Sequence, residues 1–475
     1  MNYIDNYKSW LESEYVDEQT KSELKAIEND DNEIKERFYK DLEFGTGGLR
    51  GIIGAGCNRM NIYTVRRATQ GLCEDIKKSG EQAMKAGVVI SYDCRHKSQL
   101  FAMESARVIA ANGIKAYVFD ELRPTPELSF AVRYLKAARG IMVTASHNPK
   151  EYNGYKAYGE DGGQLPPESS DYVINIIDKL DMFKDVKVAD EKDAKEKGLI
   201  KMVGSEIDDA YLAKVREQSI NEDAIKQLGD DFKIIYSPFH GTGNKPVRRI
   251  LDMIGVKNVR VVKEQELPDP DFSTVKSPNP EEKEGFKIAM QMAEKEPADL
   301  IYATDPDSDR IGVIVRDASG EFITLNGNQV GVLLCEFILR NKKLKGTLTN
   351  KGAVIKTIVT TSMIYPIAEE YNVNVHDVLT GFKFIGEKIK DFETHNYYNE
   401  FLFGFEESYG YLAGTYARDK DAVVAAMLIA EMAADYKLKG MSLYDGLMSL
   451  YKKYGFYLEG AKSLVLTGID GAEKI

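Results

Sequence analysis

Cysteine is scarce in this sequence and is not arranged as a framework. Among 475 residues there are four cysteines, Cys57, Cys73, Cys94 and Cys335, and no two of them form a Cys-x-x-Cys pair. A small disulfide-stapled fold needs many paired cysteines, so that class is excluded. Free thiols suit a reducing compartment, and we therefore expect a cytoplasmic protein.

Long apolar runs and an excess of positive charge are also missing. No stretch of about 18 apolar residues occurs, and the N-terminal segment 1–15 is polar and acidic, so we predict neither a membrane span nor a signal peptide. Lys and Arg number 63 against 75 Asp and Glu, which gives a formal net charge of −12. Without a sustained basic patch, we expect no nucleic-acid partner and no membrane partner.

The composition is that of a globular protein with room for several cores. Hydrophobic residues make up 43% and charged residues 29%. At about 150 residues per domain, the length predicts about three domains. Segments 88–120, 232–262 and 353–379 each show a strand pattern, a helix pattern and a second strand pattern. This repeated βαβ layout predicts an α/β fold of three successive related domains.

Charge-rich stretches suggest where these domains meet. We place domain I at 1–205, domain II at 206–322 and domain III at 323–455, and we interpret 456–475 as a linker or the start of an incomplete fourth domain. Within domain I, apolar residues at helical spacing predict a helix that begins at Thr64, which we interpret as its N-cap.

The first candidate site is the loop Thr-Ala-Ser-His-Asn-Pro at 144–149, which follows an apolar strand at 140–143. Pro149 disfavours helical geometry at Asn148, so the loop should stay open. Ligands in open α/β sheets bind at the loops that follow strand ends. A loop closed only by its own polar side chains is the alternative interpretation.

Two features of this segment favour a catalytic role over a loop that is closed only by its own side chains. Ser146 and His147 are adjacent, and Lys156 follows an expected Asn153-Gly154 turn. Ser146 is a candidate phosphoryl acceptor, with His147 or Lys156 as proton-handling groups. No Gly-x-Ser-x-Gly motif is present, so a hydrolase of that type is not indicated.

The second candidate site carries three aspartates, Asp305, Asp307 and Asp309, after an apolar strand. Alternate residues of an extended chain advance about 6–7 Å, so three carboxylates reach one ion only where the chain curls, and Pro306 favours such a curl. Such closely packed like charges are costly unless a cation neutralises them. All-oxygen ligands predict Mg²⁺.

Two other interpretations of the aspartate segment fit less well. An EF-hand loop needs Gly at its sixth position and Glu at its twelfth, where this sequence has Arg310 and Arg316. Aspartyl-phosphate enzymes of the haloacid dehalogenase type have a small residue at the position of Asp309. A metal-dependent aspartyl phosphatase therefore remains as a weaker alternative.

The third candidate site is a Gly-flanked loop that presents Glu406, Glu407 and Ser408. Acceptors at this spacing suit sugar hydroxyls. Arg418 and Lys420 follow closely and are candidates to bind a phosphate, Arg as a planar fork and Lys as a point charge. An acidic turn with a helix-start charge cluster is the alternative interpretation.

Weaker signals come from three Gly-containing connections at 44–51, 237–243 and 379–388, each of which could surround a phosphate with backbone N–H groups. Arg50 and Lys383 are their notable cations.

Taken together, these motifs resemble the α-D-phosphohexomutases, and within them the phosphoglucomutase/phosphomannomutase branch that includes phosphopentomutases. The matching motifs are T-A-S-H-N-P at 144–149, D-P-D-S-D-R at 305–310 and G-F-E-E-S at 404–408, supported by G-L-R-G at 48–51, L-T-G-F-K at 379–383 and R-D-K-D at 418–421. They occur in the order of the family and span most of the chain.

The resemblance implies a role for each matching residue. It implies Mg²⁺ bound by Asp305, Asp307, Asp309 and a phosphoserine oxygen on Ser146. It implies proton-handling or orienting roles for His147, Lys156 and Lys383. It implies sugar and phosphate binding by Glu406, Ser408, Arg50, Arg310, Thr380, Arg418 and Lys420.

The resemblance also implies a fold and an activity. The domains should have mixed sheets flanked by helices. The enzyme should be an isomerase that interconverts a sugar 1-phosphate and a sugar 6-phosphate, with glucose as the first expectation, through phosphoserine and a sugar bisphosphate. Glucose 1,6-bisphosphate would act as the priming activator. We expect phosphosugars as the small-molecule partners, and a monomer or a small homo-oligomer.

One family feature is not matched. The family has a fourth, C-terminal domain with an Arg-x-Ser-Gly-Thr-Glu-Pro phosphate loop, and no such motif occurs here. We therefore expect that domain to be missing or truncated. Phosphopentomutase and phosphomannomutase remain alternatives within the family. A phosphatase or an inactive phosphosugar-binding relative remains an alternative of a different class.

Overall fold

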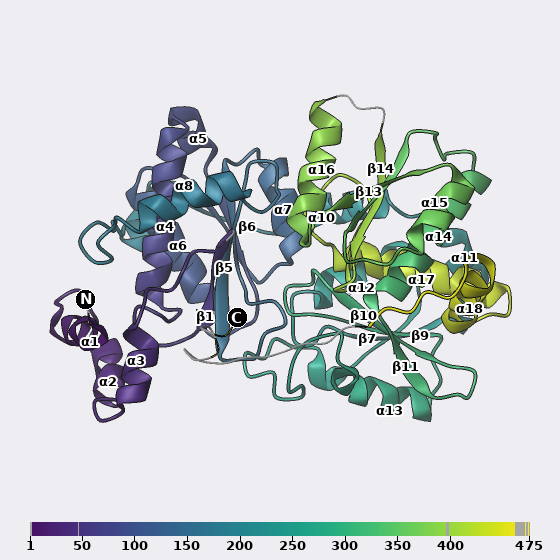
Figure 1. Ribbon diagram of the computed structural model, residues 1–475, viewed down its shortest axis with the longest axis horizontal. Helices are drawn as coiled ribbons and strands as arrows, with labels where there is room; N and C mark the ends of the chain where they lie inside the picture. The colour runs from purple at the N-terminus through teal and green to yellow at the C-terminus, as the bar shows by residue number, and fades with distance from the viewer. Residues whose placement is uncertain (1, 46, 396–398, 461–470, 472–473, 475) are drawn as a thin grey trace.

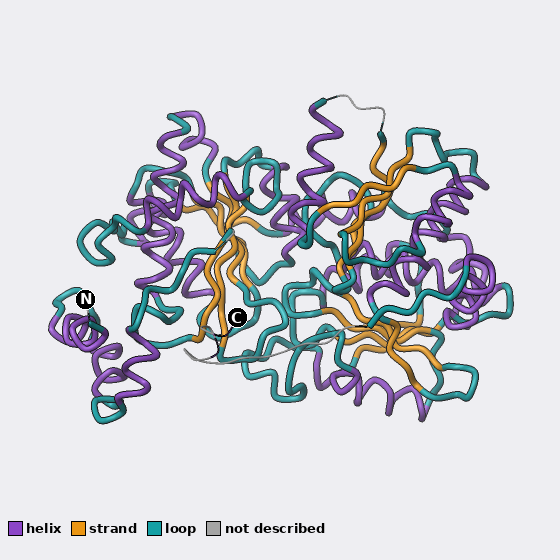
Figure 2. The backbone as a smooth tube through the Cα atoms, viewed as in Figure 1, coloured by secondary structure: helices purple, strands orange, loops and turns teal. Residues whose placement is uncertain are grey.

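The computed structural model describes residues 2–45, 47–395, 399–460, 471 and 474 (Figures 1 and 2). Three separate β-sheets follow one another along the chain, and helices pack against each of them. Most of the expected linker at 456–475 lies outside the described residues. Within the described part of the chain, no helix is long and apolar enough to cross a membrane.

The first sheet has six strands in the order β1-β5-β4-β2-β3-β6. Three N-terminal helices precede it and pack in their own apolar cluster around Trp10 and Phe38. The elements of this part are α1 (Tyr3–Glu12), α2 (Glu18–Lys25), α3 (Asp31–Phe38), β1 (Gly48–Ile52), α4 (Ile62–Lys78), α5 (Glu81–Ala86), β2 (Val88–Tyr92), α6 (Ser98–Ala111), β3 (Ala116–Phe119), α7 (Thr125–Tyr134), β4 (Arg139–Val143), β5 (Tyr152–Tyr158), α8 (Pro167–Ile177), α9 (Glu191–Glu196) and β6 (Ile200–Val203).

The second sheet has five strands in the order β11-β10-β9-β7-β8. Its elements are α10 (Ser205–Arg216), α11 (Glu222–Leu228), β7 (Lys233–Ser237), α12 (Asn244–Met253), β8 (Asn258–Val261), α13 (Lys287–Lys295), β9 (Leu300–Thr304), β10 (Ile311–Arg316) and β11 (Phe322–Leu325), with 3₁₀ turns at Gly229–Asp231, Lys263–Gln265 and Lys283–Phe286.

The third sheet has four strands in the order β13-β12-β14-β15. Its elements are α14 (Gly327–Leu344), β12 (Gly352–Thr357), α15 (Ile364–Tyr371), β13 (Asn374–Val378), α16 (Phe382–Thr394), β14 (Glu400–Glu406), β15 (Gly410–Leu412), α17 (Ala422–Leu438) and α18 (Leu443–Tyr454).

The three predicted βαβ units are confirmed. Strands β2 and β3, β7 and β8, and β12 and β13 are parallel neighbours, and a helix connects the strands of each pair. Each sheet also has an antiparallel part, formed by β1, β5 and β4, by β9, β10 and β11, and by β14 and β15. The fold is therefore three α/β units with mixed sheets, as expected.

The sheets suggest where the domains meet. Strand β11 hydrogen-bonds to β10 of the second sheet, so a boundary at 322/323 would cut that sheet. We propose that domain II extends to Leu325 and that domain III begins near Asn326, which caps α14 through its side chain. Strand β6 pairs with β3, which is consistent with a first boundary near 205.

Two local predictions in domain I were wrong. Helix α4 begins earlier than expected, because Asn61 is the N-cap and Thr64 is the third helical residue, whose hydroxyl accepts the Asn61 N–H in a capping box. The expected turn at Asn153-Gly154 lies inside strand β5 instead. A Cβ at Gly154 would come within 2.5 Å of the Thr144 carbonyl oxygen, so glycine serves close strand packing there.

Helix α17 joins the second and third units. It is buried along almost its whole length and packs against α11 and α12 of the second unit as well as against α14 (Figure 1). At its N-terminus, the buried Asp421 carboxylate accepts hydrogen bonds from Tyr211 on α10 at 2.9 Å and from Tyr416 at 2.6 Å. This carboxylate therefore ties three parts of the chain together.

Removing the Tyr211 hydroxyl should weaken this junction. We expect Tyr211→Phe to lower the free energy of unfolding by about 1–3 kcal/mol, because a buried hydrogen bond to a carboxylate is lost. Thermal and urea unfolding of purified protein would measure the change. Tyr15→Phe, at a residue that is 51% exposed, is the matched control, and equal stability of both variants would contradict the prediction.

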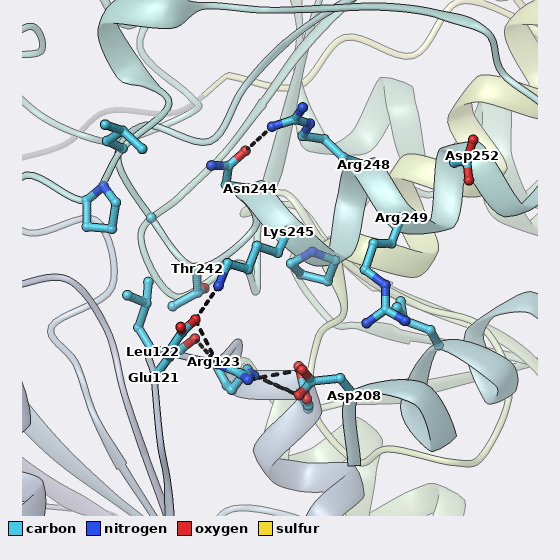
Figure 3. Close-up of a pocket in the computed structure, with 16 residues that line it drawn as sticks. Glu121, Leu122, Arg123, Asp208, Thr242, Asn244, Lys245, Arg248, Arg249 and Asp252 are labelled. Atoms are coloured by element: carbon cyan, nitrogen blue, oxygen red, sulfur yellow. Dashed lines mark hydrogen bonds and ion pairs between the residues drawn. The ribbon is translucent and has the colours of Figure 1, made fainter. Parts of the chain in front are cut away.

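The contact between the first two units encloses a cavity of about 720 Å³ (Figure 3). Its walls include the loop before α7, one side of α10 and one side of α12.

Candidate active site

The loops singled out in the sequence meet between the three sheets. The serine loop follows β4, the aspartate loop connects β9 to β10, and the Glu406 loop connects β14 to β15. The carboxyl end of a strand places each of them, which is where ligands bind in α/β sheets.

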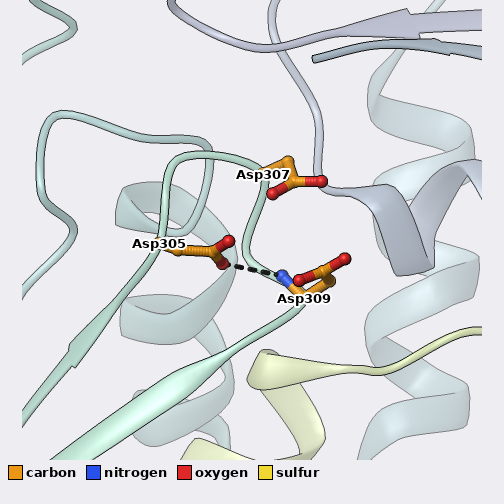
Figure 4. Close-up of side chains that lie close together, drawn as sticks. All are labelled: Asp305, Asp307 and Asp309. Atoms are coloured by element: carbon orange, nitrogen blue, oxygen red, sulfur yellow. Dashed lines mark hydrogen bonds between the residues drawn. The ribbon is translucent and has the colours of Figure 1, made fainter. Parts of the chain in front are cut away.

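The aspartate loop folds its three carboxylates toward one point. Asp305, Asp307 and Asp309 are all buried, and one oxygen from each lies within 4.8 Å of the other two (Figure 4). Hydrogen bonds within the loop stabilise this curl, because Asp305 Oδ1 accepts hydrogen bonds from the backbone N–H groups of Asp309 at 3.1 Å and Arg310 at 3.0 Å. Ser308 has a positive φ of 54°, which lets the chain turn.

This cluster fits a divalent cation. Asp307 Oδ1 and Asp309 Oδ1 are buried and have no hydrogen-bond partner. Burial and the two neighbouring carboxylates raise the pKa of Asp305 well above its usual range. An oxygen-only donor set with unpaired carboxylate oxygens is what a hard cation binds, and the cation would remove the repulsion that raises this pKa.

Ser146 lies next to the aspartates. Its hydroxyl donates to Asp305 Oδ2 at 2.7 Å and lies 3.2 Å from His147 Nδ1. Its backbone N–H donates to Thr144 Oγ1 at 2.9 Å, and its φ is 50°, a conformation that non-glycine residues adopt rarely. The loop therefore holds this one hydroxyl in a strained position that faces the cation cluster.

The structure separates the roles of His147 and Lys156. Burial lowers the pKa of His147 to about 3, helped by the positive charges of Arg310 and Arg50, so the imidazole is neutral at physiological pH and one ring nitrogen can accept a hydrogen bond. Burial opposes the charge of Lys156, but Asp307 and Asp309 outweigh it and raise its pKa. Lys156 Nζ lies 2.8 Å from Asp307 Oδ2, so it compensates charge.

Arg95 is a residue that the sequence analysis missed. Its buried guanidinium donates to the carbonyl oxygens of Ser146 and Asn148 at 2.5 Å and of Pro149 at 2.8 Å, and it lies 3.3 Å from Asp93. Asp93 in turn accepts from Thr144 Oγ1 at 2.7 Å. The Asp-x-Arg pair that directly follows strand β2 is the sequence feature that could have identified Arg95 as a candidate site residue.

We expect Arg95→Met to lower the rate of the reaction at Ser146 by about 10²-fold, because loss of three carbonyl contacts lets the Ser146 loop move by about an ångström. Steady-state kinetics would show the fall mainly in kcat, since the Glu406 loop is unchanged. Arg316→Met, at an exposed arginine of β10, is the control. Unchanged kcat in Arg95→Met would refute the positioning role.

Two further arginines lie at this cluster. Arg310 is held by Glu281, whose Oε1 is 2.9 Å from Arg310 Nη1, while Arg310 Nε is 3.8 Å from Asp309 Oδ1. Arg50 Nη1 donates to Asn148 Oδ1 of the serine loop at 3.4 Å.

Glu406, a predicted acceptor for sugar hydroxyls, is buried next to Lys420. Lys420 Nζ lies 3.1 Å from Asp309 Oδ2, 3.3 Å from Asp419 Oδ1 and 3.9 Å from Glu406 Oε1, which connects the third unit to the aspartate loop. Burial raises the pKa of Glu406. Ser408 is half-buried at the same turn.

Arg418 lies apart from these groups. Its fully buried side chain is 2.5 Å from Glu393 Oε2 and donates to the carbonyl oxygens of Thr415 and Ala417, and its backbone N–H donates to Ser129 Oγ. The structure thus gives it packing contacts between the first and third units, and its substrate contact stays a prediction.

Thr380 and Lys383 lie at the start of α16. Thr380 is exposed, and Lys383 lines a cavity of about 880 Å³ between the first and third units together with Gln164. Gln164 Nε2 donates to Asp419 Oδ2 at 3.0 Å, and Asp419 also contacts Lys420. This cavity is therefore connected to the cluster through Asp419, and the acid or base role of Lys383 stays a prediction.

Comparison with known families identifies all three units. Profiles of phosphoglucomutase/phosphomannomutase alpha/beta/alpha domains I, II and III match residues 41–184, 209–320 and 326–454, respectively.

Curated proteins named phosphoglucomutase are similar over almost the whole chain. The Staphylococcus epidermidis protein is 38% identical over 475 residues, which is 100% of this chain and 82% of that protein. The Staphylococcus haemolyticus protein is 37% identical over 442 residues, or 92% of this chain and 77% of that protein.

Solved structures of proteins with the same family names share the fold of this chain. A crystal structure of a putative phosphomannomutase from Thermus thermophilus superposes with a TM-score of 0.71 at 25% identity, over 88% of this chain and 84% of that one. A phosphoglucomutase from Paramecium shares the fold, with a TM-score of 0.66 at 19% identity over 88% of this chain and 75% of that one. This chain belongs to the phosphoglucomutase/phosphomannomutase family and is a phosphosugar mutase, an isomerase.

Proposed function

We propose that this mutase interconverts glucose 1-phosphate and glucose 6-phosphate, with Ser146 as the phosphoryl carrier. The observation that carries the proposal is the position of Ser146 Oγ, 2.7 Å from Asp305 and next to a neutral His147. Glucose is favoured as the substrate because similar full-length relatives are named phosphoglucomutase.

The reaction needs two transfers and no net change in bonds to phosphorus. In the first, the bond between Ser146 Oγ and phosphorus breaks while the sugar O6 takes the phosphoryl group, which forms glucose 1,6-bisphosphate. In the second, the bisphosphate is turned round, Ser146 Oγ takes the phosphoryl group from O1, and glucose 6-phosphate leaves. Glucose 1,6-bisphosphate therefore also primes an unphosphorylated enzyme.

The residues near Ser146 divide the remaining tasks. Neutral His147 is placed to orient the Ser146 hydroxyl through a hydrogen bond at its Nδ1. Arg310 and Lys156 supply positive charge beside the transferring group, and Glu406 and Ser408 orient the sugar. Asp305, Asp307 and Asp309 would hold Mg²⁺, which when bound stabilises charge on the phosphoryl oxygens.

A coupled assay with four sugar 1-phosphates would test the substrate. Glucose, mannose, ribose and deoxyribose 1-phosphates are compared with Mg²⁺ and a bisphosphate primer, and we expect the highest kcat/KM for glucose. A higher value for mannose would instead favour a phosphomannomutase, and a higher value for either pentose a phosphopentomutase. Release of free phosphate without isomerised sugar would favour a phosphatase.

The proposal also covers the cellular location and the oligomeric state of the enzyme. We propose a cytoplasmic protein that is a monomer or a small homo-oligomer, on the grounds of its free thiols and its small-molecule substrates. Light scattering of purified protein would establish the oligomeric state.

A further inference from the structure

The residues that line the cavity between the first two units, drawn in Figure 3, include none of the residues of the proposed active site. Its volume, about 720 Å³, is in the range of small-molecule sites, and two domains supply its walls. One wall is the segment 121–127 at the start of α7, another is Asp208 and Leu212 of α10, and the third is one side of α12.

One carboxyl oxygen in this cavity has no hydrogen-bond partner. Glu127 is only 1% exposed, it lines the cavity, and its Oε1 makes no hydrogen bond. Arg123 Nε lies 3.9 Å away but is bound to Asp208 at 2.7 Å. Burial, together with the adjacent Asp208, raises the pKa of Glu127 well above its usual range. A buried, unpaired carboxyl oxygen is stabilised when a ligand hydroxyl donates to it.

Three positively charged side chains of α12 line the cavity, and each forms an ion pair that a ligand could replace. Lys245, Arg248 and Arg249 line the cavity, and Figure 3 shows their side chains along it. Their acidic partners are Glu121, Glu266 and Asp209. Ion pairs between exposed side chains contribute little stability, so an anion in the cavity can replace these partners.

Two residues of the wall segments, Thr242 and Thr125, form hydrogen bonds to the aspartate loop. Thr242 donates its backbone N–H to the Pro306 carbonyl at 2.9 Å, and its hydroxyl lies 3.0 Å from Ser308 Oγ. Thr125, which lies between the cavity residues Arg123 and Glu127, donates to Asp307 Oδ2 at 2.7 Å. A ligand that moves either wall would shift the loop that faces Ser146.

We propose that this cavity is a regulatory site for a small hydroxylated anion, phosphorylated or carboxylated, whose hydroxyl bonds to Glu127 and whose anionic group binds the α12 wall. Occupancy changes turnover through Thr125 and Thr242. The site does not depend on which sugar the mutase prefers, because its residues lie outside the three loops of the active site.

Binding can be tested with two simple probes, glycerol 3-phosphate and glycerate, which separate the phosphate from the carboxylate source. Ligand-observed NMR titration of the full chain should show saturable binding of one of them. Arg249→Ala should weaken that binding about tenfold, because one charge-assisted contact is lost. Leu212→Trp should fill the cavity and abolish it, and Arg216→Ala, on α10 and outside the cavity lining, should not alter it.

The regulatory part is tested by mutase turnover in the presence of the bound probe. We expect a change in wild-type turnover that is lost in Arg249→Ala, whose exposed position makes misfolding no explanation. Absence of saturable binding for both probes would overturn the proposal. Equal affinity of the probe for wild type and Arg249→Ala would also overturn it, because the probe would then bind elsewhere. Binding that leaves mutase turnover unchanged would overturn the regulatory role.

Discussion

Replacing Ser146 with alanine should abolish mutase turnover, with a fall of roughly 10⁴–10⁶-fold, because it removes the hydroxyl that we propose as the phosphoryl carrier. The backbone should be retained. Alanine adopts the φ of 50° no less readily than serine, and the Thr144 and Arg95 contacts to the loop use backbone atoms of residue 146. A coupled glucose 6-phosphate assay would measure the loss.

Phosphopeptide mapping after incubation with glucose 1,6-bisphosphate provides an independent measurement. We expect phosphate on Ser146 in the wild type and none in Ser146→Ala. Ser273→Ala, at an exposed serine of the second unit, is the matched control and should behave as wild type. Phosphate on an aspartate, or a Ser146→Ala variant that retains turnover, would contradict the role of Ser146.

Removing Asp307 should have the second-largest effect. Asp307→Ala deletes one of three buried carboxylates, removes the partner of Thr125 and leaves Lys156 with Asp309 alone, so we expect Mg²⁺-dependent turnover to fall by roughly 10²–10³-fold. The isosteric Asp307→Asn should lose activity as well, because an amide supplies no negative charge. Turnover measured across Mg²⁺ concentrations, with EDTA as the zero point, tests this.

Thermal unfolding gives a readout that does not depend on catalysis. Mg²⁺ should raise the Tm of the wild type, because a ligand that binds only the folded state stabilises it, and it should raise the Tm of Asp307→Asn much less. Glu294→Gln, at an exposed carboxylate on α13, is the control and should retain the wild-type response. A wild-type rate that is insensitive to EDTA would refute the metal assignment.

The local architecture could be predicted from the sequence because it depends on contiguous patterns. The βαβ units at 88–120, 232–262 and 353–379 each contain two apolar runs of strand length around an amphipathic helix, and this pattern survives in the structure. The loops at 144–149 and 305–310 could be recognised for the same reason, since each is a short motif directly after a strand.

Errors arose where a local signal had two physical meanings. Asn-Gly is a common turn sequence, but at Gly154 the missing Cβ serves close packing between strands, which depends on Thr144 rather than on neighbouring residues. Thr64 is a good N-cap residue, yet Asn61 three positions earlier has the same property, and the structure uses both in one capping box.

Only the tertiary structure decided how the motifs act together. Ser146 and Asp305 are 159 residues apart and meet at 2.7 Å because the first and second units pack together, a contact that no local pattern encodes. Burial lowers the pKa of His147 and makes it neutral, whereas the nearby Asp307 and Asp309 keep the buried Lys156 charged, although the sequence offered both as proton-handling groups. The sequence by itself indicated most of the candidate groups of the site; their charge and partners depend on desolvation and long-range packing, which only the folded chain supplies.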